Sequence, residues 1–203
     1  MDGALDSYLL WEFSQKTVQE ALGCSPFDRN RIIGALAWAR ERIVGLTVEA
    51  KLKLVESQHQ VRADRLRTKC WTLEEYPVSR LGVVLPWMGD LPVEEIVKSF
   101  AEVAVFVRQQ AASGSASTSV RYICSLSRIH DLLQVIPIMV IEPGSEQRRP
   151  DVLKARGRED LPISPTDGYI EDGNHRALAQ AVADPDRTAI QSYVGRTTLP
   201  ARR

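Results

Sequence analysis

The first third of the chain places apolar residues at helical spacing. They recur every three or four positions from Ala4 to Leu22, which predicts a helix. A second helix is expected over 26–44, with Ser25 as its cap and Pro26 in its first turn. A third and more polar helix is expected over 48–66, capped by Thr47. The N-terminal part of the protein is therefore predicted to be helical.

The middle of the chain has a less regular pattern. Residues 70–91 are interrupted by Pro and Gly, which predicts irregular chain with one or two short strands. Pro92 is expected to open a fourth helix over 93–111. The sequence ASGSASTS at 112–119 then predicts a flexible stretch, because so polar a segment buries too little apolar surface to hold one conformation.

After residue 119 the pattern changes to short β-branched runs. Strands are expected at Val120–Leu126, Ile136–Ile141, Tyr169–Glu171 and Ile190–Val194. An Ala- and Leu-rich helix is expected over 176–183. The predicted fold class is therefore α/β (α+β), with a helical region at 1–111 and a small domain with a mixed sheet and helices at 112–203.

Composition narrows the classes of function. Lys plus Arg and Asp plus Glu both number 26, so binding to nucleic acid or to an anionic membrane would require a local patch. Cys24, Cys70 and Cys124 form no CxxC pair, which argues against disulfides and a cysteine-based zinc site. The sequence shows neither a secretory signal nor an apolar run of about 20 residues. These features predict a cytoplasmic protein with no membrane partner.

The segment YIEDGNHRALAQA combines a strand, a turn and the start of a helix. The first turn of a helix has unpaired N–H groups and a positive dipole end, both of which favour an anion such as phosphate. Gly173 allows close approach of the backbone, Arg176 offers a forked contact and His175 a further donor, with Asn174 between them. The residues alone leave two interpretations open, a phosphate site or an ordinary turn with a capped helix, as Asp172–Gly173 is also a common turn pair.

Three segments in this order resemble the ParB/sulfiredoxin-like superfamily: PIMVIEPGS at 137–145, YIEDGNHRALAQA at 169–181 and TAIQSYV at 188–194. The resemblance implies a nucleotide-phosphate site formed by Gly173, Asn174, His175 and Arg176. It also implies a nucleotide triphosphate or diphosphate with Mg²⁺ as cofactor.

The motif is most similar to the free-serine-kinase branch, whose Asp-Gly-x-His-Arg box matches Asp172 to Arg176. This implies a phosphotransferase or NTPase acting on a small molecule, with Asp172 and His175 as catalytic residues. An upstream carboxylate acts as base in those kinases. Glu142 and Glu94 or Glu95 are candidates beside Asp172, and the side chain of Glu171 is expected on the opposite face of the strand.

The sequence also departs from the superfamily. Asn174 stands where sulfiredoxins have their reactive Cys, which argues against sulfinic acid reduction. ParB proteins place a DNA-reading domain after the nucleotide motif, whereas this sequence ends soon after it. The alternative, a ParB-like DNA-binding protein, would therefore use the helical N-terminal half, where basic residues outnumber acidic ones over 29–69. A homodimer also stays open, and no metal site built from protein ligands is expected.

Overall fold

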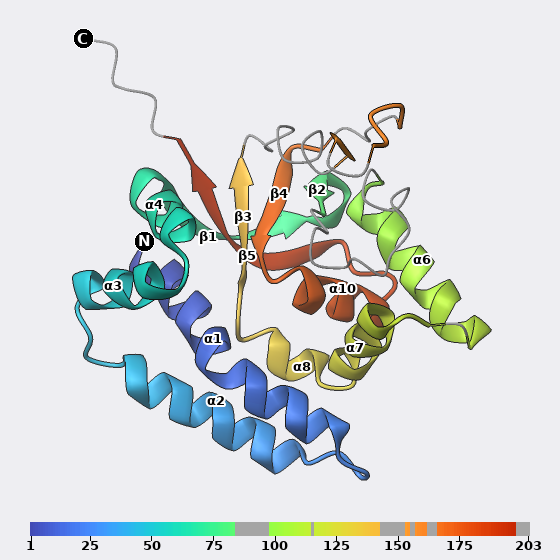
Figure 1. The fold of residues 1–203 in the computed structure, drawn as a ribbon, viewed down its shortest axis with the longest axis horizontal. Helices are drawn as coiled ribbons and strands as arrows, with labels where there is room; N and C mark the ends of the chain where they lie inside the picture. The colour runs from blue at the N-terminus through green and yellow to red at the C-terminus, as the bar shows by residue number, and fades with distance from the viewer. Residues whose placement is uncertain (84–97, 115, 143–152, 155–156, 162–165, 198–203) are drawn as a thin grey trace.

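The computed structural model describes residues 1–83, 98–114, 116–142, 153–154, 157–161 and 166–197. Helices make up most of its first part, and a five-stranded mixed sheet lies beside them (Figure 1). The predicted α+β class with a helical N-terminal half is confirmed. Within the described residues, none of the helices has the length and apolar character needed to cross a membrane.

Four helices open the fold: α1 (Asp2–Gly23), α2 (Arg29–Ile43), α3 (Val48–Gln58) and α4 (Gln60–Thr68). The predicted start of α2 at Pro26 is wrong, because the side chain of Asp28 caps the helix by accepting a 2.9 Å hydrogen bond from the amide of Arg31. The predicted third helix is two helices, since the backbone at His59 (φ −147°) leaves the helical region. Thr47 caps α3 as predicted.

The sheet has the order β1-β5-β3-β4-β2 and mixed pairing. Its strands are β1 (Cys70–Pro77), β2 (Leu81–Gly82), β3 (Ile138–Glu142), β4 (Gly168–Asp172) and β5 (Ala189–Arg196). The pairs β1/β5 and β3/β4 are antiparallel, and β5/β3 and β4/β2 are parallel. Three of the predicted strands are confirmed with small shifts. The one or two strands expected within 70–91 are β1 and β2, although β1, at eight residues, is longer than expected, and residues 84–91 lie outside the described residues.

Strands from both sides of the predicted domain boundary share this one sheet. β1 pairs along its whole length with β5, and β2 pairs with β4. The buried apolar residues of the helices and the strands also form one continuous core. A division between residues 111 and 112 therefore runs through a common sheet and a common core.

The helices after the first strands differ from their predicted bounds. Helix α6 (Phe100–Ser113) begins after a capping box formed by Ser99 and Glu102, and residues 93–97 of the predicted helix lie outside the described residues. The predicted flexible stretch at 112–119 holds the end of α6, the cap residues Gly114 and Ser117, and the start of the next helix.

The strand predicted at 120–126 is wrong. This segment belongs to α7 (Thr118–Ser127), and its buried residues Val120, Ile123 and Leu126 lie three positions apart, which is helical spacing. The short α8 (His130–Leu133) follows, and α10 (Asn174–Ala183) packs against α6, α7 and α8. In Figure 1, α3 and α4 lie to the left of the sheet, α1 and α2 lie below it, and α6, α7 and α10 lie toward the right.

Candidate functional site

The turn between β4 and α10 requires glycine. Gly173 has φ +95°, in the left-handed region, and an added Cβ would lie 2.7 Å from Cγ2 of Ile138 and 3.0 Å from Nη2 of Arg176. The N-cap residue of α10 is Gly173, which has no side chain to accept from the amides of the first turn. The amides of its first turn therefore keep the partial positive charge that attracts an anion.

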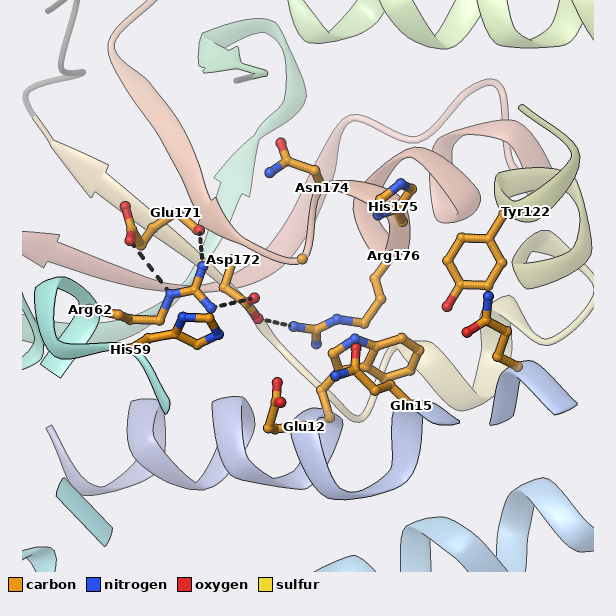
Figure 2. Close-up of a pocket in the computed structure, with 13 residues that line it drawn as sticks. Glu12, Gln15, His59, Arg62, Tyr122, Glu171, Asp172, Asn174, His175 and Arg176 are labelled. Carbon is orange, nitrogen blue, oxygen red and sulfur yellow. Dashed lines mark hydrogen bonds and ion pairs between the residues drawn. The ribbon is translucent and has the colours of Figure 1, made fainter. Parts of the chain in front are cut away.

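A cavity of about 360 Å³ lies beside this turn (Figure 2), a volume that suits a small ligand. Four parts of the chain line it. They contribute Trp11, Glu12, Gln15 and Gln19 from α1, His59 and Arg62 from the α3–α4 junction and α4, Tyr122 from α7, and residues 171–176 from β4, the turn and α10. The structure thus brings all five residues of the predicted motif to one cavity, together with N-terminal residues that sequence reasoning missed.

Arg176 is buried beneath the turn. Its side chain is 1% exposed, Nη1 donates a 2.8 Å hydrogen bond to the carbonyl of Ile136, and Nη2 donates a 2.6 Å bond to Oδ2 of Asp172. The guanidinium lies 5.1 Å from the ring centroid of Trp11. Burial lowers the pKa of Arg176, and the Asp172 carboxylate opposes that shift. These bonds are internal to the fold, so we assign Arg176 to positioning the turn.

The Asp172 carboxylate lies between two arginines. Besides Arg176, Nη1 of Arg62 is 3.5 Å from Oδ1 of Asp172, and the Arg62 guanidinium lies 5.0 Å from the ring centroid of Tyr8. Burial lowers the pKa of Arg62, and attraction by Asp172, Tyr8 and Glu171 more than offsets it, so the pKa is raised overall. A carboxylate with a cation at each oxygen is poorly placed to accept a proton from a substrate hydroxyl.

Glu171 was expected to point away from Asp172, and this is wrong. Its buried carboxylate accepts a 2.5 Å hydrogen bond from Nη1 of Arg65 and lies 3.7 Å from Nε of Arg62, both on α4. Arg62 therefore contacts two consecutive acidic side chains of β4. These ion pairs join α4 to the end of β4 (Figure 2).

An irregularity in strand pairing explains this placement. Met139 of β3 lies opposite Asp172, and the next residue, Val140, lies opposite Ile170, so the register leaves Glu171 without a partner on β3. A β-bulge of this kind interrupts the alternation of side chains and redirects them. The alternation of side chains along β4 could not predict this bulge, because the bulge depends on how β4 pairs with β3.

Asn174 and His175 extend from the start of α10 on the other side of the turn from Asp172 and Arg176 (Figure 2). The His175 ring lies edge-on to Tyr122, with centroids 5.3 Å apart. Burial raises the pKa of Tyr122 to about 12, so its hydroxyl stays protonated at neutral pH. Asn174 is buried, and its Nδ2 donates a 3.5 Å hydrogen bond to the carbonyl of Ile170. Asp172 and Arg176 therefore pair with each other on one side of Gly173, and Asn174 and His175 lie on the other side.

Glu12 is the most notable residue that sequence reasoning missed. It lines the cavity from α1, and among the described residues its carboxylate has no hydrogen-bond or ion-pair partner. Trp11, Gln15 and Gln19 line the same wall at four-residue spacing. The four-residue spacing of the two glutamines is the signal in the sequence that places them on one face of α1.

The other carboxylates considered as a base are not in the cavity. Glu142 accepts hydrogen bonds from Tyr76 (2.6 Å), Arg80 (3.1 Å) and Arg196 (2.7 Å), and it is absent from the cavity lining. Glu94 and Glu95 lie outside the described residues. In the described part of the chain, no group of three or more His, Cys, Asp or Glu side chains could hold a metal ion.

Family models, curated proteins and solved structures were compared with the chain, and none matches it.

Proposed function

We propose that the cavity at the start of α10 binds the phosphates of a nucleotide, and that the protein transfers a phosphoryl group to a small hydroxyl compound or to water. The observation that carries this proposal is the uncapped N-terminus of α10, which opens at Gly173 onto a cavity of about 360 Å³. Backbone amides and the helix dipole there favour an anion. His175, in the same first turn, adds a side-chain donor.

Phosphoryl transfer depends mainly on positioning and on stabilising the charge that develops on the transferred group. The amides of Asn174 and His175 supply that stabilisation, and Arg176 keeps them in place through Asp172. Because no protein-built metal site occurs among the described residues, a magnesium ion would enter with the nucleotide, bound mainly by phosphate oxygens.

Glu12 replaces Asp172 in our assignment of the base. Its carboxylate has no partner among the described residues, whereas Asp172 pairs with Arg62 and Arg176. In the proposed step, Glu12 takes the proton of the acceptor hydroxyl, whose oxygen bonds to the γ-phosphorus as the bond to the leaving diphosphate breaks. Asp172 acts as a positioning residue.

The basic residues of 29–69 support a small ligand over DNA. Most have an acidic partner: Arg29 with Asp131, Arg31 with Glu20, Lys51 with Asp2 and Asp6, Lys53 with Glu49, Arg62 and Arg65 with Glu171, and Arg67 with Glu56. A cation that is already paired with a carboxylate is less available to neutralise a DNA phosphate. Binding through these residues would therefore release few of the counterions held by the DNA. Within the part of the chain that the structure describes, this pairing of the basic residues does not favour the ParB-like DNA-binding alternative.

Thermal unfolding with ATP, ADP, CTP or GTP and magnesium tests the proposal. A ligand at a hundredfold excess over its dissociation constant stabilises the folded state by about 2.7 kcal/mol, which is a visible shift. The informative variant is His175→Glu, which puts a negative charge at the anion site. The matched control is Gln191→Glu, the same change in charge at an exposed position of β5.

The two effects of His175→Glu have opposite signs. An acid in the first turn of α10 complements the helix dipole and stabilises the free protein by about 0.3–1 kcal/mol. The same acid repels phosphate, so the nucleotide-dependent shift should disappear, while Gln191→Glu keeps it. A shift that survives in His175→Glu, or no shift with any nucleotide in the unchanged protein, contradicts the proposal.

A further inference from the structure

We propose that a second cavity binds a small carboxylate with an apolar body. This cavity, of about 440 Å³, lies where α1, the end of α2 and α3 meet the segment before β3 and β5. It shares no lining residue with the cavity at α10. The inference is therefore independent of the function proposed above.

The charges around this cavity leave one cation without an acidic partner. The buried ammonium of Lys51 lies 2.6 Å from Oδ1 of Asp6 and 2.7 Å from Oδ1 of Asp2, so it is already neutralised. The guanidinium of Arg40 lines the same cavity from the exposed side of α2. Among the described residues it has no hydrogen-bond or ion-pair partner.

An unpaired guanidinium beside a cavity favours a carboxylate. Its planar fork matches the two carboxylate oxygens, and a pair of such bonds is stronger than a neutral hydrogen bond. Lys51 adds no free positive charge to the same lining, because Asp2 and Asp6 both pair with it. The proposed contact with the ligand therefore rests on Arg40 alone.

The remaining walls are apolar and specify the body of the ligand. Leu10 and Ile43 are buried, whereas Val44 and Val135 are 71% and 56% exposed at the same cavity. Exposed apolar side chains grouped around a hollow are typical of a binding site. A branched aliphatic chain would remove both valines from water, at about 25 cal/mol for each Å² buried.

A titration with 4-methylvalerate, followed by saturation-transfer NMR and calorimetry, tests this inference. The matched ligand is 4-methylvaleramide, which has the same body without the charge. Arg40→Gln removes the proposed contact at an exposed position whose side chain makes no other hydrogen bond or ion pair among the described residues. Arg42→Gln is the control, since this arginine on the same helix lies over the rings of Phe13 and Trp38.

The carboxylate should bind at least roughly tenfold more tightly than the amide, as a charged hydrogen-bonded pair predicts. Arg40→Gln should abolish that difference without changing the melting temperature, and Arg42→Gln should preserve it. Val135→Glu gives a second test, because an acid at the cavity should repel the ligand. Equal binding of acid and amide, no binding of the acid at millimolar concentration, or equal loss in both arginine variants would overturn the inference.

Discussion

Asp172 accepts a 2.6 Å hydrogen bond from Arg176 across the turn that joins β4 to α10. The same guanidinium donates to the carbonyls of Ile136 and Pro137, ahead of β3. One buried side chain therefore connects a strand, a helix and the approach to a second strand. Asp172 and Arg176 therefore hold the turn in place.

Replacing Arg176 with Ala should lower the free energy of unfolding by about 3–5 kcal/mol. The change leaves the Asp172 carboxylate with one partner and deprives the carbonyl of Ile136 of its donor. It also removes the cation that lies against Trp11. Urea denaturation, followed by circular dichroism, measures the effect.

Arg40→Ala is the control for this experiment. It removes the same atoms from an exposed arginine with no partner among the described residues, so the free energy of unfolding should change by no more than about 0.5 kcal/mol. If Arg176→Ala unfolds at the same urea concentration as the unchanged protein, the guanidinium does not brace the turn.

Gly173→Ala should destabilise the protein more than Gly114→Ala. Both glycines have positive φ, +95° and +73°, which costs an alanine about 1–2 kcal/mol. At Gly114 an added Cβ meets nothing within 4 Å, whereas at Gly173 it meets Ile138 at 2.7 Å. Overpacking should therefore add about 1–3 kcal/mol at Gly173 alone. Equal losses in the two variants, measured by thermal unfolding, would show that backbone conformation alone accounts for the requirement.

The strand–turn–helix around Gly173 could be predicted because its signals are local. Asp-Gly before an Ala-rich run determines a turn and a helix start within a few residues. The other walls of the cavity depend on contacts between distant segments. Arg62 reaches Asp172 and Glu171 only because α4 packs against the end of β4, and Glu12 reaches the cavity only because α1 crosses below it. No pattern within a single segment predicts that these distant segments come together.

The incorrect predictions have similar physical causes. Val120 to Leu126 contains two β-branched residues, Val120 and Ile123, yet the cap at Ser117 and burial at every third position place the segment in a helix. One or two short strands were expected within 70–91, but the length of β1 was not, because it depends on pairing along its whole length with β5, more than a hundred residues later in the chain. In both segments, tertiary packing outweighs the propensity of the residues.

The stability of the protein should fall as the pH rises from about 10 to about 12. Burial raises the pKa of Tyr8 and of Tyr122 to about 12, from an ordinary value of 10.0. Between these values the unfolded chain loses both phenolic protons while the folded protein keeps them, so unfolding becomes more favourable. This contribution is fully present below pH 10. Urea denaturation at about pH 9 and about pH 11 measures the difference.

Tyr122→Phe is the matched variant for this pH dependence. It removes one of the two hydroxyls, so the fall in stability between the two pH values should be smaller than in the unchanged protein. Absorbance of tyrosinate should also show one fewer group titrating near 12. The same fall in both proteins would mean that Tyr122 titrates at an ordinary pKa and is not protected by burial.

Glu12→Gln should separate catalysis from binding in the proposed phosphotransferase. The amide keeps the size of the side chain but cannot accept the proton of the acceptor hydroxyl, so turnover should fall by about 10²–10⁴-fold. Nucleotide binding should stay nearly unchanged, because Glu12 lies on α1 and the phosphates are expected at the start of α10. Initial rates of phosphate transfer or release, with the thermal shift on the same samples, measure both.

The control for Glu12→Gln is Glu41→Gln, the same change at an exposed position of α2 that lines neither cavity. Turnover and nucleotide binding should both match the unchanged protein. If Glu12→Gln keeps full turnover, another group is the base. If it loses nucleotide binding together with turnover, Glu12 contacts the nucleotide or its magnesium ion, since a carboxylate that acts only in the transition state leaves ground-state binding intact.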